Sequence, residues 1–511
     1  MHRSDGFSGR VQLKRADSWL LARSLNVEYF PQRKSVFAPN ERHPGYSLDV
    51  RTTTEVAGST EVPIFRSLMS LAVPIVLANL LQSAYQLTDA FWVGRLGQDA
   101  VAAVSVSFPV TFFTIALTAG FAIAGSSLIA QYAGARNQRM VNHVAAQTLF
   151  LVVVLSIVLG AGGYLIAPAL LHAMGVTQKV FAGAVSFLHI SFLGMVFVFG
   201  FAMFQALMRG VGQATLPLAI VVGTVLLNFA LDPLFIFGWG PVPGQGVAGA
   251  ALATLSTQGL ALLVGVGILV RGTYGIELSL VGFRPDFAFI KRAFLLGFPA
   301  SIDMSSRALG VLVITFLIAS FGTLTVAAYG VGSNILQLAV ILAMGLSMAT
   351  GALVGQNIGA ENAERAERIA RLSAKIAFGT LTGLGVLAFV LAPEVVAIFI
   401  PGDPAVIREG ASFVRIMALT FGFVGVQFTV NGVFRASGNM FESMILGLVS
   451  QWVLQFPLAY VLSKHTPLGP DGLWWAFPIT NVLMAALAVA WFAQGNWKAR
   501  RLTGDGVTTR H

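Results

Sequence analysis

The chain has 511 residues, of which 56% are hydrophobic and only 11% are charged, and its formal net charge is +10. This composition offers more apolar surface than one soluble core can bury, so an ordinary soluble protein is excluded. Cysteine is absent, which excludes disulfides, thiol catalysis and cysteine-based metal sites.

The N-terminal 62 residues are polar and do not follow the pattern of a cleavable signal peptide. We expect a disordered cytoplasmic tail at 1–62, or an extension from an upstream start codon, and assign it no function.

Twelve apolar stretches follow, each long enough to cross a bilayer at about 20 residues per span. We expect every stretch to be helical, because an open strand leaves its backbone unpaired in lipid, and the continuous apolar runs lack the alternation of a transmembrane β-barrel. The fold class is therefore an all-α polytopic membrane protein. The predicted spans are 67–95, 100–131, 140–168, 180–208, 213–238, 247–270, 292–321, 324–356, 365–392, 407–434, 438–462 and 473–496.

The sequence contains an internal repeat, because its second half aligns with its first half. Residues 74–137 align with 299–362 at a shift of 225, and a second block, with Arg209 on Arg435, continues at 226. Six helices per copy give both copies the same topology, so we expect two lobes related by a pseudo-two-fold axis along the membrane normal. The predicted parts are an N-lobe at 63–270, a cytoplasmic linker at 271–291, a C-lobe at 292–497 and a cytoplasmic C-terminal tail at 498–511.

The basic residues indicate the orientation. Outside the N-terminal tail, the loops on the side of both termini hold most of the arginines and lysines, and the opposite loops hold few. This positive-inside bias places both termini in the cytoplasm and the protein in the inner (plasma) membrane. The net charge is therefore a topology signal, and we expect no nucleic-acid partner.

Three polar positions in the spans of the N-lobe have aliphatic counterparts in the C-lobe. The C-lobe shows that the fold accepts aliphatic residues at these positions, so the polar groups are additions to the N-lobe. An ionisable residue within a span is by default a candidate functional residue. Asp89, Asp232 and Thr254 fall at one depth, roughly 9 to 12 Å below the outer helix ends at 1.5 Å per residue. Asn228 lies one turn below Asp232 on the same helix face. The pairs are Asp89 and Ile314, Asn228 and Leu454, and Asp232 and Leu458.

These side chains offer two carboxylates, an amide and a hydroxyl, which suits a proton or a small hard cation. Two carboxylates in a low-dielectric site cannot both ionise at low cost, so we expect the pair to take up and release an ion. The alternative is that each aspartate only hydrogen-bonds a neighbouring helix.

Asp303 is the other deep carboxylate, and Arg307 follows it by four residues. We favour an ion pair within one helix, since residues at this spacing share a face. The alternative is that Asp303 faces a cleft between the lobes as a contact for a cation, with Arg307 as a second residue of that cleft.

Four motifs together resemble the multidrug and toxic compound extrusion (MATE) family over about residues 64–500. They are DAFWVGRLGQDAVAAVS at 89–105, NFALDPLFIFG at 228–238, GVAGAALAT at 246–254 and ALVGQNIGAENAERAERIA at 352–370. The resemblance implies a twelve-helix, two-lobe antiporter that exports cationic amphiphiles in exchange for H⁺ or Na⁺.

The family's cation site is carried over onto matching positions of the N-lobe. The resemblance adds Ala250, through its carbonyl, to the four residues already singled out: Asp89, Asn228, Asp232 and Thr254. The span at 411–432 contains Arg415 and no carboxylate, so we expect no sodium site in the C-lobe. This pattern is similar to the DinF branch of the family.

We therefore expect a multidrug efflux antiporter whose partners are cationic or amphiphilic small molecules and the lipid bilayer. It should act as a monomer, with no cofactor besides its coupling ion and with Na⁺ as the one possible metal. A flippase or exporter of a lipid-linked or other metabolite is the alternative. An enzyme is not expected, because the seven histidines are scattered and no dense polar group is present.

Overall fold

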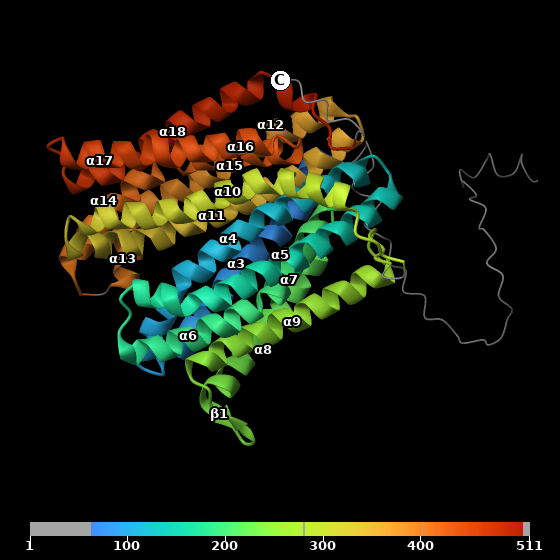
Figure 1. The fold of residues 1–511 in the computed structure, drawn as a ribbon. Helices are drawn as coiled ribbons and strands as arrows, with labels where there is room; N and C mark the ends of the chain where they lie inside the picture. Colours follow the sequence, from blue (N-terminus) through green and yellow to red (C-terminus); the bar gives the residue numbers. More distant parts are fainter. Residues whose placement is uncertain (1–62, 280–281, 401, 504–511) are drawn as a thin grey trace, which may run out of the picture. The chain divides into compact units, whose positions relative to one another are not determined.

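The computed structural model describes residues 63–279, 282–400 and 402–503, and these form mainly long helices (Figure 1). The predicted tail at 1–62 and the last eight residues of the C-terminal tail lie outside the described residues. The N-lobe consists of α3 (Ile64–Gly94), α4 (Gln98–Gly134), α5 (Gln138–Ala173), α6 (Gln178–Leu193), α7 (Met195–Gly210), α8 (Thr215–Phe237), β1 (Gly238–Trp239), β2 (Val242–Pro243) and α9 (Val247–Arg271).

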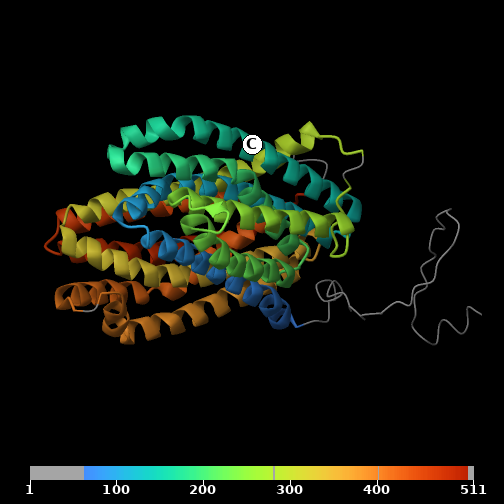
Figure 2. The ribbon, with the colours of Figure 1, turned by 90° about the horizontal axis from the view of Figure 1, so that it is seen from below.

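The C-lobe repeats this order without the strands. Its elements are α10 (Phe287–Ala319), α11 (Thr323–Gly359), α12 (Ala363–Val390), α13 (Ala392–Phe399), α14 (Pro404–Ala418), α15 (Phe421–Ala436), α16 (Met440–Leu448), a π-helix (Val449–Gln455), α17 (Phe456–Lys464), α18 (Pro470–Ala493) and a 3₁₀ turn (Asn496–Lys498). Figure 2 shows the helices of both lobes running side by side along one direction.

The twelve predicted spans are confirmed. Among the described residues, ten helices are long and apolar enough to cross a membrane, and two bent helix pairs bring the number to twelve. The bent pairs are α6 with α7, at 47°, and α14 with α15, at 51°. They are the fourth span of each lobe, so the repeat preserves the bend as well as the helix order.

Three local features differ from the expected twelve simple helices. The two-residue strands β1 and β2 form an antiparallel hairpin between the fifth and sixth spans. The short helix α13 follows the ninth span as a separate element. A π-helical segment interrupts the eleventh span just before Pro457, which lacks the amide hydrogen that a regular α-turn would use.

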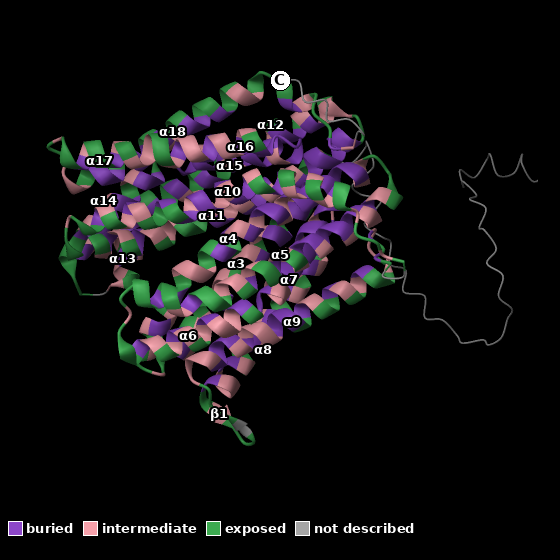
Figure 3. Ribbon diagram, viewed as in Figure 1, coloured by how far each residue is buried: buried purple, intermediate pink, exposed green. Residues whose placement is uncertain are grey.

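The loops lie at the two ends of the helices, which we call the linker face and the hairpin face. The linker face carries residue 63, the 135–137 and 360–362 loops, the linker residues 272–279 and 282–286, and residues 494–503. The hairpin face lies at the other helix ends and carries the β1–β2 hairpin. Buried residues gather in the linker-face halves of α4 and α11 (Figure 3). The two lobes are therefore packed together most closely at the linker face.

The first helix of each lobe crosses to the opposite lobe. The linker-face half of α3, with Leu68 and Leu71, belongs to the C-lobe core, and the linker-face half of α10, with Phe289 and Ala293, belongs to the N-lobe core. The crossings depend on repeat-related glycines, because a Cβ at Gly120 would overlap α10 and a Cβ at Gly345 would overlap α3. The lobes are thus interlocked symmetrically.

Trp474 is the centre of the aromatic packing in the C-lobe. Its side chain is fully buried, and its ring centroid lies 4.5 Å from that of Phe413 and 6.3 Å from that of Tyr329. A smaller side chain would leave a cavity that such packed rings cannot close.

We predict that Trp474→Ala lowers the free energy of unfolding by about 3 to 5 kcal/mol, because it removes buried contacts and leaves a void. Thermal unfolding of the purified protein in detergent measures this loss. Trp239→Ala is the matched control, since Trp239 lies in the hairpin and is 81% exposed. Equal unfolding temperatures for the two variants would contradict the prediction.

Candidate functional site

The polar residues predicted in the N-lobe lie in one layer near the hairpin face. Asp89 is five residues before the end of α3, and Asp232 is five before the end of α8. Thr254 is seven residues after the start of α9. At 1.5 Å per residue, all three lie about 8 to 11 Å from the helix ends. Oxygen-bearing side chains on three adjacent helices therefore lie at the same depth.

The side chains in this layer are in contact. Thr254 Oγ1 donates to Asp89 Oδ2 at 3.4 Å, and Asn228 Nδ2 donates to Asp232 Oδ1 at 3.1 Å. The Asp89 carboxyl also interacts with the side chains of Asp232 and Asn228. The structure thus joins the four residues singled out by comparing the two repeats into one cluster, which we call the aspartate cluster.

Three oxygens of the aspartate cluster are buried and accept no hydrogen bond from any of the described residues. They are Asp89 Oδ1, Asp232 Oδ2 and Asn228 Oδ1. Leaving a buried acceptor unsatisfied is costly, and native proteins avoid it except where the group serves another purpose. These oxygens can therefore accept a proton or ligate a small cation.

Ala250, the fifth predicted residue, lies in the first turn of α9, four residues before Thr254. It is 2% exposed and packs in a small apolar cluster with Val93 and Ile236. This apolar cluster lies on the hairpin-face side of the aspartate cluster, one helical turn from it.

Two aromatic residues that the sequence analysis missed adjoin the aspartate cluster. Tyr85 is buried, and its hydroxyl lies 2.7 Å from Thr257 Oγ1. Trp92 packs against Phe229, with ring centroids 5.7 Å apart. Tyr85 and Trp92 are four residues before and three after Asp89, so the helical spacing that places residues on one face could have identified both.

Asp303 lies between two arginines in the C-lobe. Arg307 Nε is 3.1 Å from Asp303 Oδ1, as the spacing of four residues predicts, and Arg435 Nη2 is 2.5 Å from Asp303 Oδ2. Arg435 lies one residue beyond the predicted span at 407–434, but only 13% of its side chain is exposed. The C-lobe carboxylate is therefore fully buried and neutralised within the protein.

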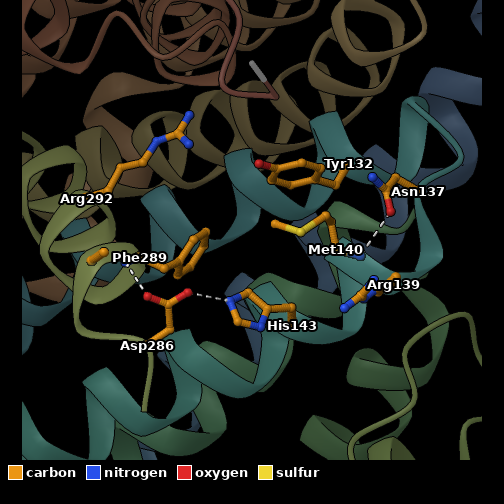
Figure 4. Close-up of a pocket in the computed structure, with 9 residues that line it drawn as sticks. Tyr132, Asn137, Arg139, Met140, His143, Asp286, Phe289 and Arg292 are labelled. Atoms are coloured by element: carbon orange, nitrogen blue, oxygen red, sulfur yellow. Dashed lines mark hydrogen bonds and ion pairs between the residues drawn. The ribbon is translucent and has the colours of Figure 1, made fainter. Parts of the chain in front are cut away.

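A separate pocket opens at the linker face, between α4, α5 and the start of α10, with a volume of about 760 Å³ (Figure 4). His143 Nε2 lies 3.2 Å from Asp286 Oδ2 at its edge. The backbone N–H of Phe289, and then His143, hold the pKa of the Asp286 carboxyl below its usual value. None of the predicted site residues lines this pocket, so it is distinct from the aspartate cluster.

A family model described as MatE matches residues 74–234 and 299–461, one segment in each lobe. Among curated relatives, the "Probable multidrug resistance protein YpnP" of Bacillus subtilis is 29% identical over 87% of this chain and 98% of its own length. The "FAD transporter" of Shewanella oneidensis is 27% identical over 86% of this chain and 96% of its own length.

Two solved structures are similar to this chain over 86% of its length and 97% of theirs. One is titled as the outward-facing conformation of a multidrug resistance MATE family transporter of the MOP superfamily, with a TM-score of 0.81 and 25% identity. The other is a MOP superfamily transporter from Pyrococcus furiosus, with a TM-score of 0.80 and 26% identity. Its title states that the reverse polarity of its binding pocket suggests a different function.

We predict that Asp303→Asn lowers the free energy of unfolding by about 3 kcal/mol, because it leaves two mostly buried arginine side chains without their fully buried anion. Thermal unfolding in detergent again measures the loss.

The control for this substitution is Glu364→Gln. Glu364 pairs with Arg368 at 3.9 Å, and both side chains are mostly exposed. Such a surface pair contributes about 0 to 1 kcal/mol. A loss in Asp303→Asn no larger than that in the control would show that the buried ion pairs do not stabilise the lobe.

Proposed function

The chain belongs to the MatE family of membrane transporters, and from this premise we propose that it exports cationic or amphiphilic small molecules in exchange for H⁺ or Na⁺. It is a transporter and not an enzyme, and the names of its relatives support multidrug efflux as its general activity. The coupling ion, the substrate class and the site are our proposal.

The observation that carries the proposal is the set of three buried oxygens without donors in the aspartate cluster. They belong to two carboxylates and an amide that interact with one another. A proton or a Na⁺ among them would supply the missing positive charge and satisfy the lone pairs. The residues present therefore fit a coupling ion of either kind.

The aspartate cluster can couple ion binding to the shape of the N-lobe. With an ion bound, Asp89 on α3 and Asp232 on α8 attract a shared positive charge and draw the two helices together. Without it, two carboxylates repel one another in a medium of low dielectric. Helix α3 also packs its linker-face half into the C-lobe core. A shift of α3 at the aspartate cluster would thus reach the contact between the lobes.

We propose that an ion enters the cluster from the hairpin face while the substrate leaves there, and that the ion departs at the linker face. The excess of basic residues supports a cytoplasmic linker face in the inner (plasma) membrane. One chain carries both lobes and the complete aspartate cluster, which supports a monomer as the working unit. A substrate cation and the coupling ion would then compete for the same negative charge within one molecule.

An anionic or lipid-linked metabolite is the second candidate substrate, because the relative from Shewanella oneidensis is named an FAD transporter. Recognition of phosphate groups by a central site requires available cationic side chains. Arg307 and Arg435, the deep cationic groups of the C-lobe, are both paired with Asp303. This pairing favours the cationic substrate.

We predict that Asp89→Asn and Asp232→Asn each reduce coupled transport of a cationic dye at least about tenfold, a change of 1.4 kcal/mol or more. Asparagine keeps the size and polarity but cannot carry the charge that the ion neutralises. Dye uptake into proteoliposomes is measured under an imposed pH gradient, first without sodium and then under a sodium gradient.

The control variant is Asp99→Asn, because Asp99 is exposed at the start of α4 and lies outside the aspartate cluster. It should transport dye like the unmodified protein. Normal coupled transport by both cluster variants would refute the proposal. Absence of dye movement in the unmodified protein under either gradient would favour the metabolite substrate instead.

A further inference from the structure

Two glutamines related by the repeat join the lobes reciprocally near the linker face. Gln131 Nε2, on α4 of the N-lobe, donates to the carbonyl of Ala436 in the C-lobe at 2.7 Å. Gln356 Nε2, on α11 of the C-lobe, donates to the carbonyl of Gly210 in the N-lobe at 2.9 Å. Each carbonyl belongs to the C-terminal end of the bent fourth span of its lobe. We call these two hydrogen bonds the glutamine clasps.

The backbones of α4 and α11 meet beside the glutamine clasps. A Cβ added at Gly134 would overlap the carbonyl of Gln356, and one at Gly359 would overlap the carbonyl of Gln131. The two helices therefore touch backbone to backbone at the linker face. The clasps and the glycines close the linker face in this structure.

Leu502 makes the closure asymmetric. Its backbone N–H donates to Gln131 Oε1 at 2.7 Å, so the amide of Gln131 is used as both donor and acceptor. Its carbonyl accepts from Arg292 at 2.5 Å and from Tyr132 at 3.4 Å. The Leu502 side chain is 4% exposed and packs in the N-lobe core. Leu502 binds Gln131 and not Gln356, so among the described residues the terminal segment reinforces one clasp of the two.

The residues just before Leu502 are held by the C-lobe. Trp497 is 1% exposed and packs in the C-lobe core, and Lys498 pairs with Glu367 at 2.6 Å. Arg500 pairs with Glu442 at 3.4 Å. Residues 496–502 thus start on one lobe and end in the other, and we call them the C-terminal latch.

We propose that Gln131 and Gln356 are the gate residues of the linker face and that the C-terminal latch selectively stabilises the closed gate through Gln131. This inference rests on the proposed transport function, because alternating access requires the linker face to open. Opening separates α4 from α11, so both glutamine clasps must break and the latch must release one lobe. The gate is a positioning device and contacts neither ion nor substrate.

Because Leu502 binds Gln131, substitutions of the two glutamines should differ in their effect on the linker face. Gln→Met keeps the length of the side chain and removes its hydrogen bonds. Gln356→Met breaks one clasp, and Gln131→Met breaks the other clasp and also the bond to Leu502. Loss of one neutral hydrogen bond should raise the ratio of open to closed molecules about fivefold. Gln131→Met should therefore open the linker face more than Gln356→Met does.

The test uses the absence of cysteine from the chain, which allows spin labels to be placed without background. Val270→Cys and Lys375→Cys put one label on each lobe, at exposed positions on the linker-face side of α9 and α12. Electron–electron double resonance in nanodiscs then gives the distance distribution between the lobes without substrate or ion gradient. A longer distance reports an open linker face.

We predict a larger open fraction for Gln131→Met than for Gln356→Met in the full chain. In a chain that ends after Gly495, and so lacks the latch, the two substitutions should have equal effects. A chain that ends after Thr503 keeps the latch and serves as the control for shortening. It should reproduce the asymmetry of the full chain.

An unchanged distance distribution in both methionine variants would overturn the gate. Equal effects in the full chain would overturn the role of the latch. The same variants are assayed for dye export separately, and the distances do not depend on that assay. Larger distances in a protein that exports no dye would support the gate and count against the proposed substrate class.

Discussion

A carboxylate buried among helices needs a positive charge beside it, and the two lobes meet this requirement differently. In the C-lobe, Arg307 and Arg435 hold Asp303 from both sides, so the charge is balanced within the chain. In the N-lobe, the Asp89 and Asp232 carboxyls interact with each other and with an amide, and among the described residues no basic side chain forms an ion pair with either. We therefore propose that the N-lobe carboxylates take their positive charge from a bound ion, whereas Asp303 is paired within the chain.

The arrangement of the lobes connects this requirement to movement. Helix α3 carries Asp89 near the hairpin face, and its other half is part of the C-lobe core. A change at the aspartate cluster can therefore act on the contact between the lobes through one rigid helix. At the linker face, the lobes are held by Gln131 and Gln356 through two hydrogen bonds that the repeat makes equivalent. A transporter with two exchanging states needs such discrete contacts, which are either made or broken.

Apolar run length and the internal repeat together predict the helices, the lobes and the aspartate cluster, because these follow from local hydropathy and from aliphatic counterparts such as Ile314 opposite Asp89. The sequence could not predict that the linker-face halves of α3 and α10 pack in the core of the opposite lobe, since the cores of both lobes are equally apolar. The second partner of Asp303 was missed because Arg435 is 132 residues away and sits beside a loop. The bond from Leu502 to Gln131 spans 371 residues, and no periodicity reports such a contact. Sequence thus predicts which residues share a helix face, and only packing decides which faces meet.

We propose that the aspartate cluster is one negative site that binds either a coupling ion or a cationic substrate. Calorimetric titration of the detergent-solubilised protein with tetraphenylphosphonium, in buffers of different ionisation enthalpy and with or without sodium, measures ion displacement directly. We predict that substrate binding releases protons, or that sodium weakens binding, and that neither effect occurs in the double variant Asp89→Asn and Asp232→Asn. Substrate binding that releases no proton and does not respond to sodium would contradict it.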